Sequence, residues 1–356
     1  MEDVGKYYEA ALIDSADGIQ FKVYSSSHPK GFIIAKPKYI PCGTLDLVGL
    51  KKRFLFGKCM FRFNLFNKKE SVEKNLAAIR KKFPYYIYEC KKHRNWFLGV
   101  PEGKVEKFYD TKKGFQELLK VPVEDLDPYL KAVREMTGIL NDAGISNENL
   151  GISHSTLLGN YTPGKSDMDI LIFGIENGWK AVKHLETRSH PALKWKSEQD
   201  WARYFRDRIV SEVYSEQEYA KNMARKRDDG FIDGNVFSLF CIEEGKGWYN
   251  WEEEHEPLGT VKISGTVKDA RYSIVRPGFY ELENTKILEG HKEVPVKRIV
   301  TWARPFALQA KEGEKVEACG LLEKVKGKEE YYQLVLGYFD TYTSDRGKKE
   351  YMKALI

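Results

Sequence analysis

Two aspartates spaced two residues apart at the head of an apolar run constrain this chain more than any other feature. The segment reads Ser166-Asp167-Met168-Asp169-Ile170-Leu171-Ile172. Because residues i and i+2 of a β-strand point to the same face, Asp167 and Asp169 should project side by side. Adjacent carboxylates repel each other unless a cation lies between them. Mg²⁺, or Mn²⁺ in its place, suits such a pair because it prefers oxygen ligands and leaves positions open for substrate phosphates.

A segment with small residues lies just upstream and reads Ser155-Thr156-Leu157-Leu158-Gly159. Such a segment lets the backbone approach a phosphate, so we expect Ser155 and Gly159 to contact a triphosphate. Lys165 and Ser166 follow the Pro163-Gly164 turn and are further candidates for nucleotide binding. For Lys165, a solvated turn lysine is the alternative interpretation.

The order strand, Ser-x-x-x-Gly, turn, Ser-Asp-x-Asp, strand resembles the nucleotidyltransferase superfamily, which has the DNA polymerase β-type fold. The second motif is intact at 166–169, and its spacing from the first motif also fits. The first motif departs from the family pattern, because His154 stands where the family has its first glycine. The whole chain looks like an archaeal group of predicted nucleotidyltransferases.

The resemblance implies an Mg²⁺-dependent enzyme that transfers a nucleoside monophosphate from an NTP to a hydroxyl of a nucleic acid or a protein. Asp167 and Asp169 would hold one or two ions for in-line displacement. Family enzymes usually carry a third carboxylate on a later strand, but the strand expected at 236–242 contains no acid. Asp233 is the best candidate for this third catalytic residue, although Asp-Gly is also a common hairpin turn.

The lack of an acid on that strand supports an alternative, a non-catalytic nucleic-acid-binding protein that retains the nucleotidyltransferase fold. A regulatory protein that binds a partner is also compatible with the sequence. Clustered basic residues, such as Lys51-Lys52-Arg53 and Arg225-Lys226-Arg227, can follow an RNA or DNA backbone, or can form a solvated surface.

The chain is predicted to be an α+β protein of three domains. Residues 1–122 form an α+β domain, 123–247 a nucleotidyltransferase-type mixed sheet with helices, and 248–356 a small β-barrel-like domain for which the OB type is one candidate. Tyr272, Tyr280, Trp302 and Phe306 of the last domain either stack on single-stranded nucleic acid or belong to its core.

Bulk properties favour a cytoplasmic protein without membrane contact. No apolar run approaches the length of a membrane span, and the N-terminus lacks the features of a secretory signal. The five cysteines are scattered and form no Cys-x-x-Cys pair, so we expect free thiols in a reducing compartment.

Overall fold

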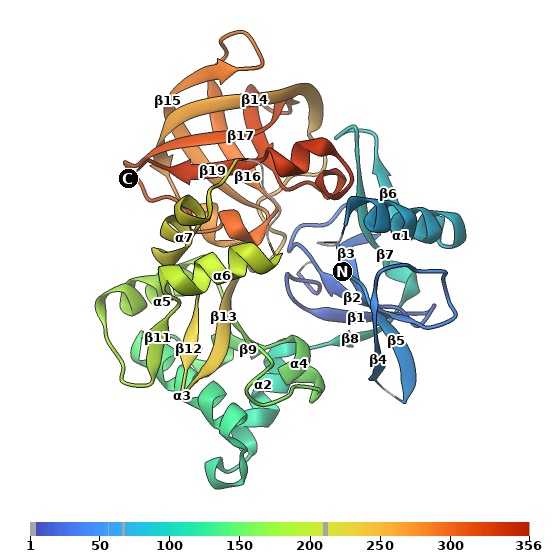
Figure 1. The fold of residues 1–356 in the computed structure, drawn as a ribbon, viewed down its shortest axis with the longest axis vertical. Coiled ribbons are helices and arrows are strands. Elements are labelled where there is room, and N and C mark those ends of the chain that lie inside the picture. Colours follow the sequence, from blue (N-terminus) through green and yellow to red (C-terminus); the bar gives the residue numbers. More distant parts are fainter. Residues whose placement is uncertain (1–4, 56, 66–67, 209–212, 356) are drawn as a thin grey trace.

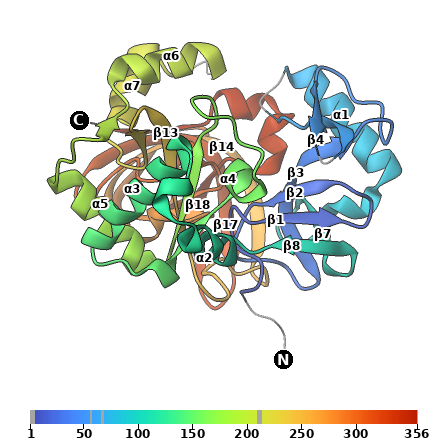
Figure 2. The same cartoon turned by 90° about the horizontal axis from the view of Figure 1, so that it is seen from below.

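The computed structural model describes residues 5–55, 57–65, 68–208 and 213–355. This part of the chain forms three β-sheets and seven α-helices, which confirms the α+β class (Figure 1). The three sheets are built from consecutive parts of the chain and lie around a common centre (Figures 1 and 2). None of the described helices combines the length and apolarity that a membrane crossing requires.

The N-terminal sheet has eight strands. The order of six is β4-β5-β3-β2-β1-β8, while β7 pairs with β3 and β6 pairs with β7. The strands are β1 (Leu12–Ser15), β2 (Gln20–Val23), β3 (Phe32–Pro41), β4 (Lys51–Leu55), β5 (Lys58–Arg62), β6 (Ile87–Cys90), β7 (Asn95–Pro101) and β8 (Val105–Tyr109). Helix α1 (Lys69–Lys82) packs against the core of this sheet through Val72, Leu76 and Ile79, which recur at helical spacing.

Cys42 and Cys59 form a disulfide, so the expectation of five free thiols is wrong for this pair. Cys42 directly follows β3, and its backbone N–H donates to the carbonyl of Cys59 on β5 at 2.9 Å. The two Cα atoms are 5.4 Å apart, within the range of disulfides. Cys90, Cys241 and Cys319 are free thiols.

The central sheet has the order β11-β12-β13-β10-β9. Its strands are β9 (Leu150–Ile152), β10 (Met168–Phe173), β11 (Leu193–Trp195), β12 (Asp229–Ile232) and β13 (Asn235–Ile242). The associated helices are α2 (Thr111–Lys120), α3 (Pro128–Asp142), α4 (His154–Leu158), α5 (Ile175–Thr187), α6 (Glu198–Arg208) and α7 (Glu216–Ala224).

Helix α3 begins as its sequence predicts, because the Asp127 carboxylate accepts the Leu130 N–H at 2.8 Å and proline occupies the first turn. Its apolar side and Phe115 of α2 share one core with Ile170 and Leu239 of the sheet. By packing, α2 therefore groups with the central sheet, although it precedes the expected boundary at residues 122 and 123.

The C-terminal sheet closes into a barrel. Strands β14 (Glu254–Asp269), β15 (Gly278–Glu289), β16 (Val296–Thr301), β18 (Glu330–Leu336) and β17 (Lys315–Lys326) pair in this order, and β17 also pairs with β14. Strand β19 (Tyr351–Ala354) adds to β17. Tyr280 and Trp302 are fully buried, which confirms the core interpretation for these two aromatics.

The barrel and the N-terminal sheet share a hydrophobic core. Trp302 and Tyr338 of the barrel unit contact Phe97 of β7, with ring centroids 5.5 and 5.7 Å from that of Phe97.

The basic run at 225–227 makes contacts within the protein. Arg225 pairs with Glu314, and buried Lys226 lies 3.7 Å from Asp228.

Candidate functional site

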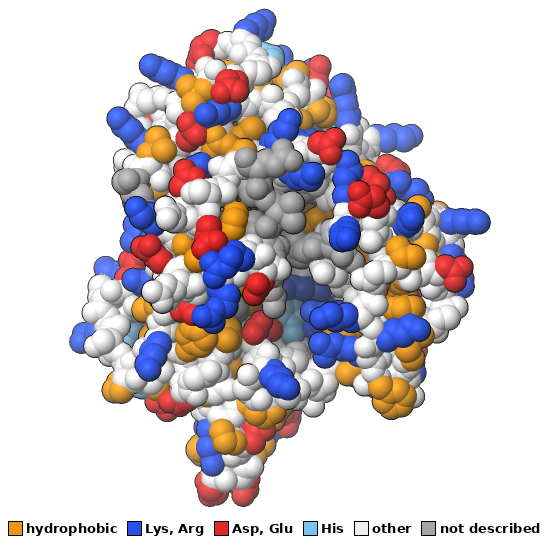
Figure 3. Space-filling model, in the orientation of Figure 1, with side chains coloured by type: hydrophobic (Ala, Val, Ile, Leu, Met, Phe, Trp, Pro, Cys, Tyr) orange, Lys and Arg blue, Asp and Glu red, His pale blue; other side chains and the backbone are white. Residues whose placement is uncertain are grey.

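A hollow lies between the central sheet and the N-terminal sheet. On the face shown in Figure 3, acidic side chains lie on one side of it, Lys and Arg side chains on the other, and a histidine at its floor. His154 at the start of α4 and Asp169 on β10 lie close to Lys22 of β2 and Lys38 of β3.

The two aspartates of the second motif lie at the start of β10, as the sequence predicts. Met168 and Ile170 point into the core shared with α3. Strand alternation therefore directs Asp167 and Asp169 to the opposite face. Asp167 is exposed, whereas only 16% of the Asp169 side chain is exposed.

His154 is a direct partner of Asp169. Its Nδ1 lies 2.8 Å from Asp169 Oδ2, and its Nε2 is buried without a hydrogen-bond partner. Burial lowers the pKa of His154 to about 3, so the imidazole is neutral at pH 7 and Nδ1–H donates to the carboxylate. Burial would raise the pKa of Asp169, but His154 and the nearby cations Lys22 and Lys38 lower it to about 2.

The backbone explains why a glycine is expected at position 154. His154 has a φ of 51°, in the left-handed region that side chains with a Cβ rarely adopt. Ser153 fixes the entry to α4, because its hydroxyl donates to the Ala10 carbonyl at 2.5 Å and its N–H to the Asp169 carbonyl at 3.0 Å. The backbone at position 154 therefore has a conformation that glycine adopts readily, while its imidazole lies beside Asp169.

Gly159 ends α4 with a φ of 67°, and a Cβ at this position would meet nothing within 4 Å. Glycine is therefore favoured at position 159 by the backbone conformation and not by a close neighbouring atom. Ser155 is partly buried on the same helix. The Tyr129 hydroxyl donates to the Asp167 carbonyl at 3.0 Å, so it accepts the hydrogen bond from the Thr156 hydroxyl, 2.8 Å away. Tyr129 of α3 thus joins the two motifs.

Ser166 and Lys165 belong to the turn between the motifs. The Ser166 hydroxyl accepts the Thr162 N–H at 2.9 Å, so it stabilises the turn. Lys165 is exposed. Their contact with a nucleotide stays a prediction, as does that of Ser155 and Gly159.

The acid expected on the later strand is replaced by a serine. In the parallel pairing of β10 with β13, Ser238 lies opposite Asp169. In the antiparallel pairing of β13 with β12, Asp229 lies opposite Ser238, whose hydroxyl donates to Asp229 Oδ1 at 2.5 Å. Asp169, Ser238 and Asp229 therefore form a row across three neighbouring strands.

Asp233, the acid chosen from the sequence, occupies a hairpin turn. It has a φ of 47°, is followed by Gly234 at 76°, and is exposed. Sequence reasoning missed Asp229, although a signal was present. A two-residue Asp-Gly turn fixes the hairpin register, and counting back from it places Asp229 opposite Ser238.

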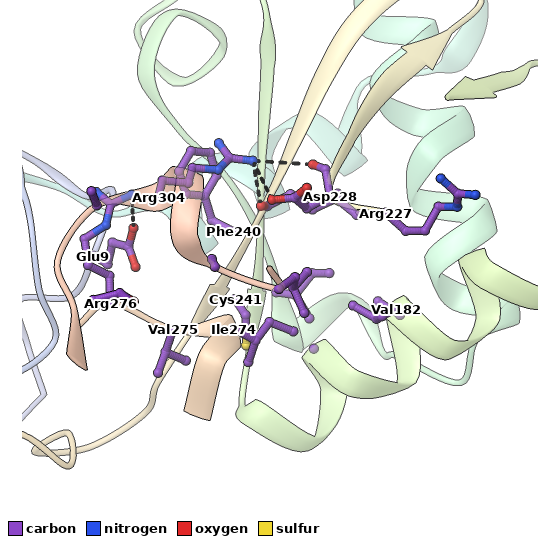
Figure 4. A pocket seen from close by; sticks show the side chains of 18 residues that line it. Glu9, Val182, Arg227, Asp228, Phe240, Cys241, Ile274, Val275, Arg276 and Arg304 are labelled. Carbon is purple, nitrogen blue, oxygen red and sulfur yellow. Dashed lines mark hydrogen bonds and ion pairs between the residues drawn. The ribbon is translucent and has the colours of Figure 1, made fainter. Parts of the chain in front are cut away.

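Asp229 is held by two cations. Lys196 Nζ lies 3.3 Å from Oδ1, and Arg304 Nη2 lies 3.2 Å from Oδ2. Arg304 also bonds the backbone at Asp228 and covers the Phe240 ring at 4.0 Å (Figure 4). The opposite wall brings Lys22 to 4.8 Å from the same ring.

Figure 4 shows a cavity behind this arginine, between the central sheet and the barrel. It is lined by Cys241, Val182 and Ile274 among other residues and has a volume of about 40 Å³. That is room for about one water molecule and not for a nucleotide. The open hollow, and not this cavity, is therefore the candidate substrate site.

Three lysines lie on the neighbouring strands β2 and β3 of the N-terminal sheet, and two of them, Lys22 and Lys38, are close enough to Asp169 to lower its pKa. Burial lowers the pKa of Lys22 to about 7, and it lowers those of Lys36 and Lys38 well below the usual range. Lys36 Nζ donates to Tyr342 Oη at 2.5 Å. No sequence pattern singled out these lysines, because Lys22 and Lys38 meet Asp169 only through tertiary packing and Lys36 joins them by pairing with Lys22.

The carboxylates of Asp167 and Asp169 are suited to a metal ion that is also bound by substrate phosphates. In the described ranges, no three His, Cys, Asp or Glu side chains are arranged to hold a metal. Mg²⁺ is commonly bound by one or two carboxylates together with substrate phosphates. Asp167 and Asp169 fit an ion that arrives with a nucleotide, whereas a closed protein site is not formed.

The chain is similar to an uncharacterized protein of Methanocaldococcus jannaschii. The two are 24% identical over 357 residues, which cover 96% of this chain and 97% of that protein. No protein-family model and no solved structure matches the chain.

Proposed function

We propose that the chain is an Mg²⁺-dependent nucleotidyltransferase that transfers a nucleoside monophosphate from an NTP to a hydroxyl acceptor. The placement of Asp167 and Asp169 carries the proposal. Both lie on the solvent side of β10, next to the start of α4 and across a hollow from a lysine-rich wall. This arrangement offers metal ligands and phosphate-binding groups within one site.

Asp167 and Asp169 would hold the ion that accompanies the triphosphate. When bound, Mg²⁺ would neutralise developing charge on the phosphates and align the attacking hydroxyl. His154 is a positioning residue, because its Nδ1–H orients the Asp169 carboxylate and leaves the other carboxylate oxygen for a ligand. Ser155 and the backbone at the start of α4 would contact phosphate oxygens.

Asp229, and not Asp233, is the better candidate for the third acid. It reaches the row that contains Asp169 through the hydroxyl of Ser238. In this arrangement Ser238 would orient the acceptor hydroxyl, while Asp229 keeps the serine proton directed away from the acceptor oxygen.

An exposed edge of the N-terminal sheet favours a nucleic acid as acceptor over a protein. Phe54 on β4 is 78% exposed, and Lys51, Lys52 and Arg53 precede it on the same exposed edge strand. An exposed aromatic ring flanked by cations suits stacking on a base next to a phosphate backbone. The closed five-stranded barrel is also compatible with an OB-type domain.

The second candidate function is a non-catalytic nucleic-acid-binding protein with the same fold. It is favoured by the partners of the acids, because Asp169 is bonded to His154 and Asp229 to Lys196 and Arg304. In this alternative a neutral imidazole and two cations occupy the carboxylates in place of metal ions.

Label transfer distinguishes the two functions. The protein is incubated with each α-labelled NTP, Mg²⁺ and either total RNA or a protein extract. We expect Mg²⁺-dependent label transfer to RNA that is lost in Asp167→Asn and retained in Asp142→Asn, a matched change at an exposed residue of α3. No transfer, together with no Mg²⁺-dependent NTP binding, would refute the enzyme and leave the binding protein.

A further inference from the structure

The lysine cluster of the N-terminal sheet, defined as Lys22, Lys36 and Lys38, concentrates positive charge where it is costly. Lys22 on β2 and Lys36 on β3 are direct cross-strand partners. Like charges in such positions destabilise a sheet. The pairing of β2 with β3 then skips Lys38, which is the extra residue of a β-bulge. Bulges often direct a side chain toward a functional site.

The surroundings do not compensate this charge. Arg276 is paired with Glu9 at 3.3 Å, and Arg304 is paired with Asp229. Lys22 and Lys38 have neither an ion pair nor a side-chain hydrogen bond within the described ranges. Asp169 is the acid that attracts both of them, and it already accepts a hydrogen bond from His154.

Lys36 is held in place by aromatic rings. Its ammonium lies 3.6 Å from the centroid of Tyr24, 4.3 Å from Tyr342 and 5.0 Å from Phe339. Such a cage stabilises a cation without neutralising it. The cluster is therefore preorganised, and a bound polyanion would favour the charged form of these lysines, whose pKa values burial lowers.

We propose that the lysine cluster binds the triphosphate group of the nucleotide substrate, so that the N-terminal sheet completes the site begun by β10 and α4. Lys22 and Lys38 are enclosed beside Asp169, where phosphates bound to the same metal ion would lie, and Lys36 is the cross-strand partner of Lys22. A phosphodiester backbone is better matched by the exposed edge of β4. The nucleotide identity of the ligand rests on the proposed function, but the affinity of the cluster for a triphosphate does not.

Calorimetric titration with inorganic tripolyphosphate in the absence of metal tests the cluster directly. We expect the wild type to bind, and Lys22→Met and Lys38→Met each to weaken binding by about 10- to 100-fold, since each removes a charge-assisted hydrogen bond. Lys107→Met, at an exposed position of β8 in the same sheet, should bind like the wild type. The melting temperatures of the ligand-free Lys22→Met and Lys38→Met proteins should rise, because buried like charges are removed.

Other results would overturn the assignment. These are a wild type that does not bind tripolyphosphate, or folded Lys22→Met and Lys38→Met proteins that bind it as tightly as the wild type. A single-stranded oligonucleotide that binds through Lys22 and Lys38 when tripolyphosphate does not would assign the cluster to the acceptor. Lysine-dependent tripolyphosphate binding without label transfer would refute the enzyme and retain the cluster. Label transfer with an unchanged KM for NTP in both lysine variants would support the enzyme and refute the assignment of the cluster to the triphosphate.

Discussion

Replacement of His154 by glycine and by alanine isolates the cost of its left-handed backbone. Both substitutions remove the imidazole and its hydrogen bond to Asp169, so these losses cancel in the comparison. Only alanine retains a Cβ at a φ of 51°. That conformation costs a residue with a Cβ about 1–2 kcal/mol, while glycine loses about 0.5–1 kcal/mol more in unfolded-state entropy. His154→Gly should therefore be more stable than His154→Ala by about 0.5–1 kcal/mol.

Urea unfolding of the two variants measures this difference from their midpoints. Ser155 supplies the matched control, because it follows directly on α4 and does not have a positive φ. There the order should reverse, with Ser155→Ala more stable than Ser155→Gly by about 0.5–1 kcal/mol. If alanine is as stable as glycine at position 154, the inference that the left-handed backbone favours glycine there is refuted.

Three further predictions concern the third acid, the pH dependence of stability and the disulfide. Asp229→Asn should reduce label transfer by about 10- to 100-fold, because the Ser238 hydroxyl then loses the carboxylate that orients it, whereas Asp233→Asn should leave transfer unchanged. The opposite order would favour Asp233 as the third acid. Burial lowers the pKa of His93 to about 2, so the unfolded chain binds a proton on this ring below about pH 6.5 and the folded chain does not. The free energy of unfolding should therefore decrease as the pH falls from 6.5, and His93→Phe should show a shallower decrease, measured by urea unfolding at several pH values. Mass spectrometry after alkylation without reductant should find Cys42 linked to Cys59. Serine at both positions should lower the free energy of unfolding by about 3 kcal/mol, the value expected for a loop of this length; full alkylation of both thiols would contradict the pairing.

Local sequence signals predicted the elements that frame the site. The Asp127 cap and Pro128 gave the start of α3, and the Asp233-Gly234 pair gave the hairpin of β12 and β13. The alternation around Asp169 gave the face of β10. These features depend on neighbours in the sequence, so a short segment contains the information that determines them.

The rest of the site depends on contacts between distant segments. Lys22 and Asp169 interact although they lie on different sheets, and nothing in either segment indicates the other. The pairing of Cys42 with Cys59 follows from the register of β3 with β5. Asp229 was within reach of prediction, because the hairpin turn sets its register, but its ion pair with Arg304 of the barrel was not.

A crystal of the protein with Mn²⁺ and a non-hydrolysable NTP analogue tests the central claim most directly. Anomalous scattering should locate Mn²⁺ between the carboxylates of Asp167 and Asp169, with the triphosphate extending toward Lys22 and Lys38. The Asp167→Asn protein should lack this peak under the same conditions. A nucleotide bound elsewhere, or Mn²⁺ absent from this carboxylate pair, would contradict the proposed metal and nucleotide site.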